Sequence, residues 1–354
     1  IRHRGPDSEG YWHDADSGIA LGHRRLAIVD LSPEGAQPMQ SACGRYVLAF
    51  NGEVYNHLDL RGLLGYPSWR GHSDTESLLA GFSAWGISAT LERCIGMFAF
   101  AVWDKQERTL SLARDRLGEK PLYYGWQGHG ESKSFLFGSD LAALKAHPAF
   151  AGDINRDALS LYMRRSVVGG TNSIYQGIYK LEPACLLTIS LSSCEPKLVP
   201  YWSLVEVAEQ GVIHPFDGTN REAVDILESL LMDAVRRQMI ADVPLGAFLS
   251  GGIDSSTIVA LMQCQSSRSI KTFTIGFNEE AYNEAVYARA VARHLGTDHH
   301  QLYVTPQQVL EVIPKLPALY SEPFADSSQI PTFLVSQLAR QHVSVSLSGD
   351  AGDE

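Results

Sequence analysis

The sequence is poor in cysteine and holds no paired cysteine motif. Its five cysteines lie at positions 43, 94, 185, 194 and 264, and none forms a C-x-x-C pair. This spacing gives no support to a zinc site, and scattered thiols are typical of a reducing compartment. The sequence also lacks any run of about 18 apolar residues, so it predicts no membrane span. We therefore expect a cytoplasmic protein.

The chain also lacks an excess of basic residues. Lys and Arg number 29 against 40 Asp and Glu, and the formal net charge is −11. Binding to a phosphate backbone depends on Lys and Arg, so this acidic balance disfavours nucleic acid as a partner. Small anionic ligands held by local groups are compatible with the charge.

The sequence has no initiator methionine and no signal peptide at its start. It opens at Ile1 and stops at Glu354, directly after a strand-like run and a glycine-rich acidic turn. We expect an internal fragment of a longer protein. The 354 residues, 45% of them hydrophobic, suit two domains rather than one.

Residues 1–200 read mainly as strands, in an α+β arrangement. The stretch 46–56, YVLAFNGEVYN, has an apolar run, a polar turn and a second apolar run. Residues 97–103 are apolar on both faces, as in a strand buried inside a sandwich. A helix is predicted at 74–86, closed by Gly86. The predicted strands fall in 46–56, in a hairpin over 96–115, and in 121–126 and 134–140.

Residues 221–354 alternate helices and strands, after a linker rich in Pro, Gly, Ser and Asn at 201–220. Such alternation predicts a parallel sheet with helices on both faces. Asn283 is the expected N-cap of the third helix. The predicted helices are 221–239, 254–267, 284–295 and 330–341, and the predicted strands are 247–250, 271–277, 300–304 and 343–347.

One stretch carries a chemical signal, FLSGGIDSS at 248–256. A strand, a glycine turn and a helix start together form a phosphate cradle, because backbone N–H groups and the helix dipole face the anion. Asp254 would repel phosphate unless a Mg²⁺ ion bridges the two. No Lys or Arg occurs between positions 238 and 267, which disfavours a kinase or GTPase and favours a pyrophosphate site. The alternative is a tight strand–helix turn with a serine cap and no ligand.

A second strand ends in a similar turn, SLSGDAGDE at 346–354. Strand ends of an open parallel sheet converge on one crevice, so Asp350 and Asp353 are expected to approach the same metal or substrate. The alternative is a solvated Gly-Asp turn.

These motifs resemble the glutamine-hydrolysing asparagine synthetases. That family joins a class II glutamine amidotransferase domain, an Ntn-type αββα sandwich, to an α/β ATP-pyrophosphatase domain. The resemblance covers most of 2–139 and 241–354. It rests on these strings, in family order: RHRGPDSEGYW, GHRRLAIVDLS, QPM, NGEVYNH, ARDRLGEKPLYY, VPLGAFLSGGIDSS, TFTIGF, EPFADSSQIPT and LSGDAGDE.

The resemblance implies adenylation of the aspartate β-carboxylate by ATP, followed by attack of ammonia derived from glutamine. It also allows a homodimer. Asp350 stands where the family has an acidic residue tied to the acyl-adenylate step, and Asp254 and Asp353 match the metal-binding carboxylates. The residues matching the family's ATP site are Leu249, Ser250, Gly251, Gly252, Asp254, Ser255, Ser256, Ile275, Ser348 and Gly349.

The family's glutamine pocket also has matching residues here. Arg25 would grip the substrate carboxylate, and Glu53 and Asp74 would meet its α-ammonium. Asn51 and Gly52 would donate hydrogen bonds to the oxyanion. Each residue also has a structural alternative: Arg25 on a solvated edge, Asn51-Gly52 as a hairpin turn, and Asp74 as a helix N-cap.

The sequence departs from the family at the nucleophile, which is an N-terminal cysteine whose own α-amine is the base. Residue 1 here is Ile1. Cys43 is followed by Gly44, as the family cysteine is, but an interior cysteine has no free amine. Truncation or natural loss would both explain this, and the retained pocket favours truncation. We expect the 354-residue fragment to be inactive in both half-reactions.

Alternatives to asparagine synthesis remain open from the sequence. Relatives within the same fold form β-lactams, cyclise peptides, or amidate sugar acids of surface polysaccharides. A non-catalytic relative that senses glutamine or nucleotide is a second class. A tRNA-modifying enzyme is a third, which the net charge of −11 disfavours.

Overall fold

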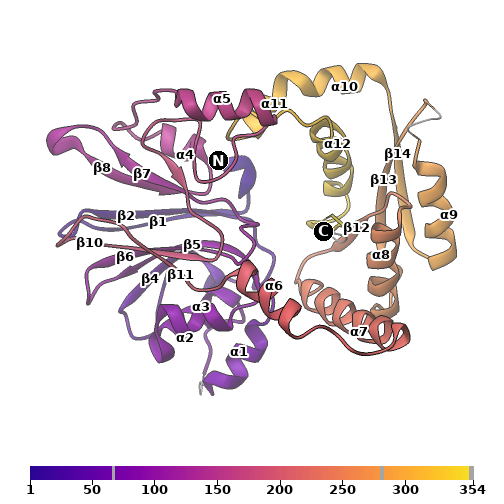
Figure 1. Cartoon of the computed structure of the whole chain (residues 1–354), viewed down its shortest axis with the longest axis horizontal. Helices are drawn as coiled ribbons and strands as arrows, with labels where there is room; N and C mark the ends of the chain where they lie inside the picture. Colours follow the sequence, from indigo (N-terminus) through magenta and orange to yellow (C-terminus); the bar gives the residue numbers. More distant parts are fainter. Residues whose placement is uncertain (66–67, 280–282, 351–354) are drawn as a thin grey trace. The chain divides into compact units, whose positions relative to one another are not determined.

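The computed structural model describes residues 1–65, 68–279 and 283–350 (Figure 1). The chain divides into two compact units, Ile1–Phe216 with Tyr320–Ala325, and Asp217–Leu319 with Asp326–Glu354. Within the described residues, no helix has both the length and the apolar character needed to cross a membrane.

The first unit is built on two layers of antiparallel strands. One layer is a six-stranded sheet in the order β11-β10-β6-β5-β4-β3. The other contains the pair β1-β2 and the three-stranded sheet β8-β7-β9. The strands are β1 (Ser8–Asp14), β2 (Ile19–Arg25), β3 (Met39–Gln40), β4 (Tyr46–Val54), β5 (Gly96–Asp104), β6 (Thr109–Arg114), β7 (Tyr123–Gln127), β8 (Ser134–Gly138), β9 (Tyr179–Lys180), β10 (Cys185–Ser190) and β11 (Lys197–Pro200).

Helices cover the outer faces of both layers, which gives the predicted αββα sandwich (Figure 1). Phe82 of α2 packs on Phe100 of the six-stranded sheet, with ring centroids 5.4 Å apart. On the other side, Leu141 and Leu144 of α4 pack with Leu136 of β8. The helices are α1 (His57–Leu64), α2 (Asp74–Trp85), α3 (Ile87–Arg93), α4 (Leu141–Lys145), α5 (Arg156–Arg165) and α6 (Leu204–Ile213).

The prediction of a turn at Asn51-Gly52 is wrong, because β4 runs straight through both residues. Asn51 pairs with Ala99 and Gly52 with Phe98 of β5. Gly52 has φ +150, and a Cβ there would lie 2.1 Å from the carbonyl oxygen of Met97. This glycine therefore serves close strand pairing instead of chain reversal.

The alternative that Asp74 is the N-cap of α2 is wrong. Ser73 is the N-cap, and its Oγ accepts a hydrogen bond from the N–H of Glu76. Asp74 is the first helical residue, so its carboxylate is not committed to capping. Gly86, with φ +84, ends the helix as predicted.

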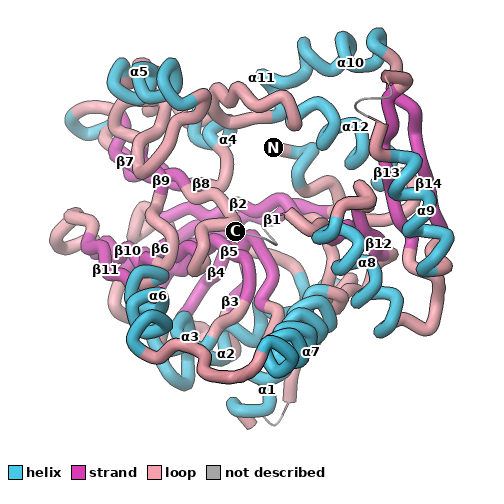
Figure 2. Tube along the Cα trace, turned by 45° about the vertical axis from the view of Figure 1, so that its right-hand side comes forward, coloured by secondary structure: helices cyan, strands magenta, loops and turns pink. Residues whose placement is uncertain are grey.

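The second unit contains a four-stranded parallel sheet in the order β14-β13-β12-β15. Three of its strands, β12, β13 and β14, are labelled in Figure 2. Val259 and Met262 of α8 and Ala288 of α9 pack on one face, while Ala339 of α12 packs with Phe273 on the other. This confirms the α/β class. The elements are α7 (Asn220–Gln238), β12 (Leu245–Phe248), α8 (Ile253–Gln265), β13 (Lys271–Phe277), α9 (Ala285–Leu295), β14 (Asp298–Val304), α10 (Pro306–Val312), α11 (Leu316–Leu319), α12 (Gln329–Arg340) and β15 (Val345–Leu347).

The cap of α9 lies one residue later than predicted. Glu284 occupies the N-cap position without a side-chain capping bond. Asn283 still contributes locally, since its Oδ1 accepts from the N–H of Ala285 at 3.3 Å.

A short segment from late in the sequence, Tyr320–Ala325, belongs to the first unit. The Glu322 carboxylate pairs with Lys180 Nζ at 2.5 Å and accepts from the N–H of Ile174 at 2.8 Å. The Ala325 N–H donates to the carbonyl of Ser166 at 2.9 Å. No pattern in the sequence predicts this excursion, because it depends on contacts between distant positions.

Candidate active sites

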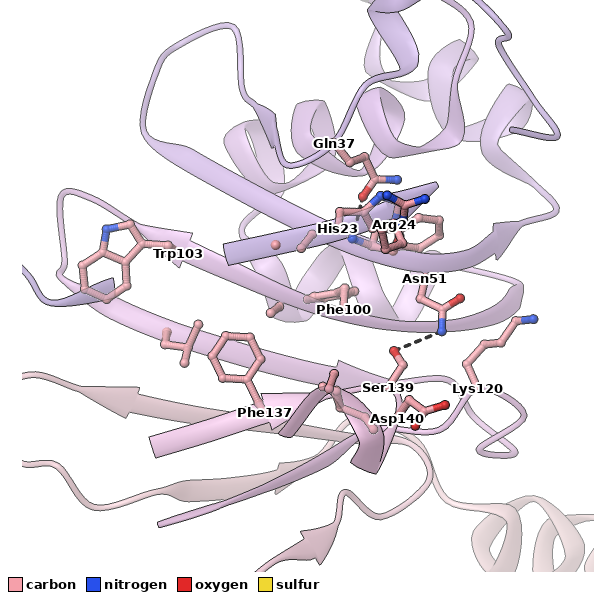
Figure 3. Close-up of a pocket in the computed structure, with 18 of the residues that line it drawn as sticks. His23, Arg24, Gln37, Asn51, Phe100, Trp103, Lys120, Phe137, Ser139 and Asp140 are labelled. Atoms are coloured by element: carbon pink, nitrogen blue, oxygen red, sulfur yellow. Dashed lines mark hydrogen bonds between the residues drawn. The ribbon is translucent and has the colours of Figure 1, made fainter. Parts of the chain in front are cut away.

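The first unit contains a cavity of about 880 Å³. All five residues predicted to bind glutamine line it: Arg25, Asn51, Gly52, Glu53 and Asp74. They come from β2, β4 and α2, so only the folded chain brings them together. Figure 3 shows Asn51 facing Ser139 across the cavity, with Trp103 towards the other end. Their roles in binding stay predictions.

Side chains along β4 alternate between two environments. Leu48, Phe50 and Val54 belong to the core that also contains side chains of the helices on the outer face. Because successive side chains of a strand point to opposite faces, Asn51 and Glu53 point towards the other layer and the cavity.

The backbone of β4 has a free edge beyond its short pairing with β3. Phe50 N–H donates to Gln37 Oε1 at 2.7 Å, and Val54 N–H donates to Asp74 Oδ2 at 2.9 Å. Because N–H directions alternate along a strand, the Gly52 N–H points to the same edge, between these two bonds. Gly52 also lines the cavity, so a backbone donor is available where an oxyanion would need one.

Arg25 is buried, with only 9% of its surface exposed, so the solvated-edge alternative is wrong. Its Nη1 donates to the carbonyl of Ser32 at 3.3 Å, and its Nη2 donates to the carbonyls of Val29 and Asp30. These bonds fasten the loop after β2. A guanidinium has five N–H donors, so these three bonds leave the Nε–H and one Nη1–H unused.

Glu53 and Asp74 form an acidic pair, in which Asp74 is buried and Glu53 is partly buried. Burial, with the Asp74 carboxylate nearby, raises the pKa of Glu53 to about 8, and the Lys120 ammonium opposes this rise. Burial also raises the pKa of Asp74, although the N–H groups of Val54 and Thr75 favour its ionised form. Both carboxyls are therefore harder to ionise than isolated ones, and a cation that enters between them would favour their ionised forms.

The acidic pair predicts a pH-dependent affinity for glutamine. Because the pKa of Glu53 is raised in the empty pocket, its carboxyl ionises only towards higher pH, and it must ionise to bind an α-ammonium. In the full-length protein we expect KM to fall about tenfold as pH rises from 6.5 to 8.5. Glu53→Gln should remove that dependence. The inhibition constant of L-glutamate should follow the same profile, since it reports these contacts without the chemical step; a flat profile in the wild type would contradict the prediction.

Asp115 organises the loop that brings Lys120 to the cavity. The side chain is fully buried, and its carboxylate accepts four backbone hydrogen bonds of 2.9–3.2 Å, from Phe98, Leu117, Glu119 and Lys120. Several N–H bonds on one carboxylate satisfy an otherwise costly buried charge.

Asp115→Asn is expected to destabilise the first unit by about 2 kcal/mol, because an amide has one acceptor oxygen and no charge. Urea unfolding monitored by tryptophan fluorescence would measure this. Asp16→Asn, a turn substitution on the exposed loop between β1 and β2, is the control. Equal midpoints for the two variants would refute the role given to Asp115.

In the second unit, the glycine turn after β12 has the shape of a cradle. Gly251 has φ +86, and a Cβ there would lie 2.7 Å from the backbone nitrogen of Ala288. Ser250 Oγ lies 2.9 Å from Ser255 Oγ and accepts from the N–H of Gly252 at 3.2 Å. These bonds fold the turn back onto the start of α8, where the helix dipole favours an anion.

The second predicted loop lies against the first. A Cβ on Gly349 would be 2.7 Å from the backbone nitrogen of Ser255, so the two turns touch. Ser348 Oγ donates to Asp350 Oδ2 at 3.0 Å. The structure thus brings 250–256 and 348–350 together. Asp353, the other predicted metal ligand, lies outside the described residues.

Three further residues of the predicted ATP site have distinct environments. Leu249 is 1% exposed and packs in the core beside α8, so its side chain is not at a surface. Ile275 is partly buried on the adjoining strand. Ser256 Oγ is buried without a hydrogen-bond partner among the described residues, as expected for a hydroxyl beside a site for a polar ligand.

Comparisons with known proteins match each of the two units to a family. The family described as "Glutamine amidotransferase domain" matches residues 1–202, and the one described as "Asparagine synthase" matches residues 226–354. The chain is 37% identical over 373 residues to a Methanocaldococcus jannaschii protein named putative asparagine synthetase (glutamine-hydrolyzing) 2, covering 100% of this chain and 70% of that one. The chain belongs to the glutamine-hydrolysing asparagine synthetase family.

Other relatives in this family are longer. Asparagine synthetase (glutamine-hydrolyzing) 1 of Bacillus subtilis is 34% identical over 357 residues, covering 100% of this chain and 54% of the relative. The chain thus spans about half the length of several curated relatives. Among solved structures, a glutamine phosphoribosylpyrophosphate amidotransferase from B. subtilis matches with a TM-score of 0.36 at 18% identity, over 82% of this chain and 55% of that one.

The resemblance to the asparagine synthetase family does not point to three residues that line the cavity of the first unit, Lys120, Ser139 and Asp140. Lys120 lies within the motif ARDRLGEKPLYY, but the sequence does not show that its ammonium lies near enough to Glu53 to influence its pKa. Asp140 pairs with Arg4 at 2.6 Å. A Ser-Asp pair after a strand is too common to predict either contact.

Proposed function

We propose that the full-length polypeptide carrying these residues catalyses ATP-dependent amide synthesis. Aspartate, glutamine and ATP would give asparagine, glutamate, AMP and pyrophosphate. The observation that carries the proposal is the free edge of β4, where the Gly52 N–H opens into a cavity shared with Arg25 and the Glu53–Asp74 pair. Membership of the family supports assigning the two half-reactions to one protein, with glutamine hydrolysis in the first unit and ATP-dependent activation in the second.

In the glutaminase reaction, a thiol attacks the side-chain amide carbon of glutamine. The carbonyl oxygen becomes an oxyanion, to which Asn51 and Gly52 donate. The C–N bond then breaks, ammonia leaves with a proton from the base, and water hydrolyses the thioester to glutamate. Arg25 holds the α-carboxylate, and Glu53 and Asp74 hold the α-ammonium throughout.

The thiol has to come from outside these five cysteines. Only Cys194 lines the cavity. Cys194 comes four residues after Ser190, the last residue of β10. Ser190 pairs with Thr109, which in turn pairs with Asp104 at one end of β5. Asn51 pairs with Ala99, nearer the other end of β5. Ala99 and Asp104 are five residues apart along β5, which corresponds to about 17 Å. We therefore propose an N-terminal cysteine in the complete protein, with its own α-amine as base, and expect the 354-residue chain alone to form no asparagine.

In the synthetase reaction, an oxygen of the aspartate β-carboxylate attacks the α-phosphorus of ATP. The bond from that phosphorus to the bridging oxygen breaks, and pyrophosphate leaves into the cradle formed by Ser250, Gly251 and Gly252. Asp350 would act at the acyl-adenylate. Ammonia then attacks the acyl carbon, and AMP leaves as asparagine forms.

The residues present fit Mg²⁺ as the metal. In ATP sites this ion is held by one or two carboxylates plus phosphate oxygens, which suits Asp254 in the first turn of α8. Within the described residues no group of three or more His, Cys, Asp and Glu gathers as a metal site, so a Zn²⁺-type cage is absent there. The ion, when bound, would neutralise charge on the leaving pyrophosphate, with Asp254 and Asp353 as its protein ligands.

The test uses the full-length protein. We expect glutamate from glutamine alone, pyrophosphate from ATP only when aspartate is added, and asparagine when all three are present. Pyrophosphate release with another carboxylate in place of aspartate would refute aspartate as the acceptor. No pyrophosphate release with any carboxylate would refute ATP-dependent adenylation as the reaction. The homodimer and the cytoplasmic location stay predictions.

A further inference from the structure

A hydrogen bond between two side chains crosses the cavity of the first unit and joins its two layers. Asn51 Nδ2 donates to Ser139 Oγ at 3.0 Å, and the two residues are 88 positions apart (Figure 3). Asn51 lies in the middle of β4, while Ser139 directly follows β8. The predicted oxyanion donor is thus tied to the opposite layer.

Ser139 stands on a rigid frame. The next residue, Asp140, caps α4 by accepting from the N–H of Ala142 at 2.8 Å, and pairs with Arg4 at 2.6 Å. Leu141 is fully buried in the core under α4. Its N–H donates to Ser321 Oγ at 3.4 Å. The backbone on the C-terminal side of Ser139 is therefore held in place by these contacts.

The Asn51 side chain depends on a hydrogen-bond partner for its orientation, whereas the other proposed oxyanion donor, the Gly52 N–H, does not. The Gly52 N–H is fixed by strand pairing, whereas a carboxamide turns about two side-chain torsions. A catalytic donor is effective only if it already points at the developing charge. Since an amide nitrogen carries two hydrogens, one can bind Ser139 while the other stays free for the oxyanion.

We propose that Ser139 is a positioning residue of the glutaminase reaction, whose hydroxyl holds the Asn51 carboxamide in the orientation that donates to the oxyanion. The inference rests on the proposed function and adds a residue to it. Ser139 itself touches neither the α-carboxylate nor the α-ammonium of glutamine. Its loss should therefore lower kcat and leave KM nearly unchanged.

The test compares Ser139→Thr with Ser139→Val in the full-length protein, because the two side chains match in shape and differ by one hydroxyl. We expect Val to lower kcat for glutamine hydrolysis about tenfold with KM within twofold, and Thr to keep kcat within about threefold of the wild type. Ser134→Ala is the control, since Ser134 also lines the cavity but donates to the carbonyl of Ser132. Its kcat should not change.

A double-mutant cycle separates positioning from a general structural effect. In an Asn51→Ala background, Ser139→Val should have no further effect on kcat, because the group it positions is gone. Equal losses in both backgrounds, or equal kcat for Thr and Val, would overturn the role of Ser139. A wild type that hydrolyses no glutamine would overturn the proposed function instead, so the two failures are distinguishable.

Discussion

Asn51→Ala in the full-length protein is expected to lower kcat for glutamine hydrolysis by about 10²–10³-fold, with KM nearly unchanged. One preorganised oxyanion donor contributes this much in a water-poor site. The side chain makes a single hydrogen bond in the described structure, to Ser139, and it lies on a nine-residue strand paired on β5. Glutamate release under saturating glutamine measures the effect.

Asn51→Asp keeps the shape of the side chain and replaces the donor by a carboxylate, which would repel an oxyanion. We expect its kcat to be at least as low as that of Asn51→Ala. Both variants should bind L-glutamate as the wild type does, because Arg25 and the Glu53–Asp74 pair are intact. A loss in kcat below threefold for either variant would remove Asn51 from the catalytic set.

The sequence predicts the second unit better than the first. Hydrophobic periodicity placed α7, α8, α9 and α12 within two residues of their observed bounds, and β13 at its observed bounds. These elements alternate and are local, so short windows carry the signal. In the first unit, β1 and β2 were not predicted, because Gly10, Gly22 and exposed polar residues interrupt their patterns.

The turn wrongly assigned to Asn51-Gly52 shows why local rules fail at a site. Asn-Gly is a strong hairpin signal in a short window. Here the conformation is decided by Phe98, a distant strand neighbour, and by the need to place an N–H at a cavity. Contacts such as Asn51–Ser139 and Lys180–Glu322 lie far beyond any window, so only the folded chain reveals them.

Gly251→Ala is expected to abolish adenylation, lowering aspartate-dependent ATP–pyrophosphate exchange by more than about 100-fold in the full-length protein. Gly251 has φ +86, a conformation that costs other residues about 1–3 kcal/mol. A Cβ there would also lie 2.7–2.8 Å from backbone atoms of Tyr287 and Ala288 in α9, which cannot move separately from their helix. The turn would have to open, and its N–H groups would no longer converge on pyrophosphate.

Gly252→Ala is the matched control, because Gly252 differs from Gly251 in its backbone φ and in the space available for a Cβ. Gly252 has φ −71, and a Cβ there would meet only Ser250 Oγ, at 3.3 Å. We expect its thermal unfolding temperature to stay close to that of the wild type, while Gly251→Ala unfolds at a lower temperature and loses the stabilisation given by ATP with Mg²⁺. A Gly251→Ala protein that exchanges pyrophosphate within threefold of the wild type would show that the turn does not hold the leaving group, and the nucleotide would then have to bind elsewhere in the second unit.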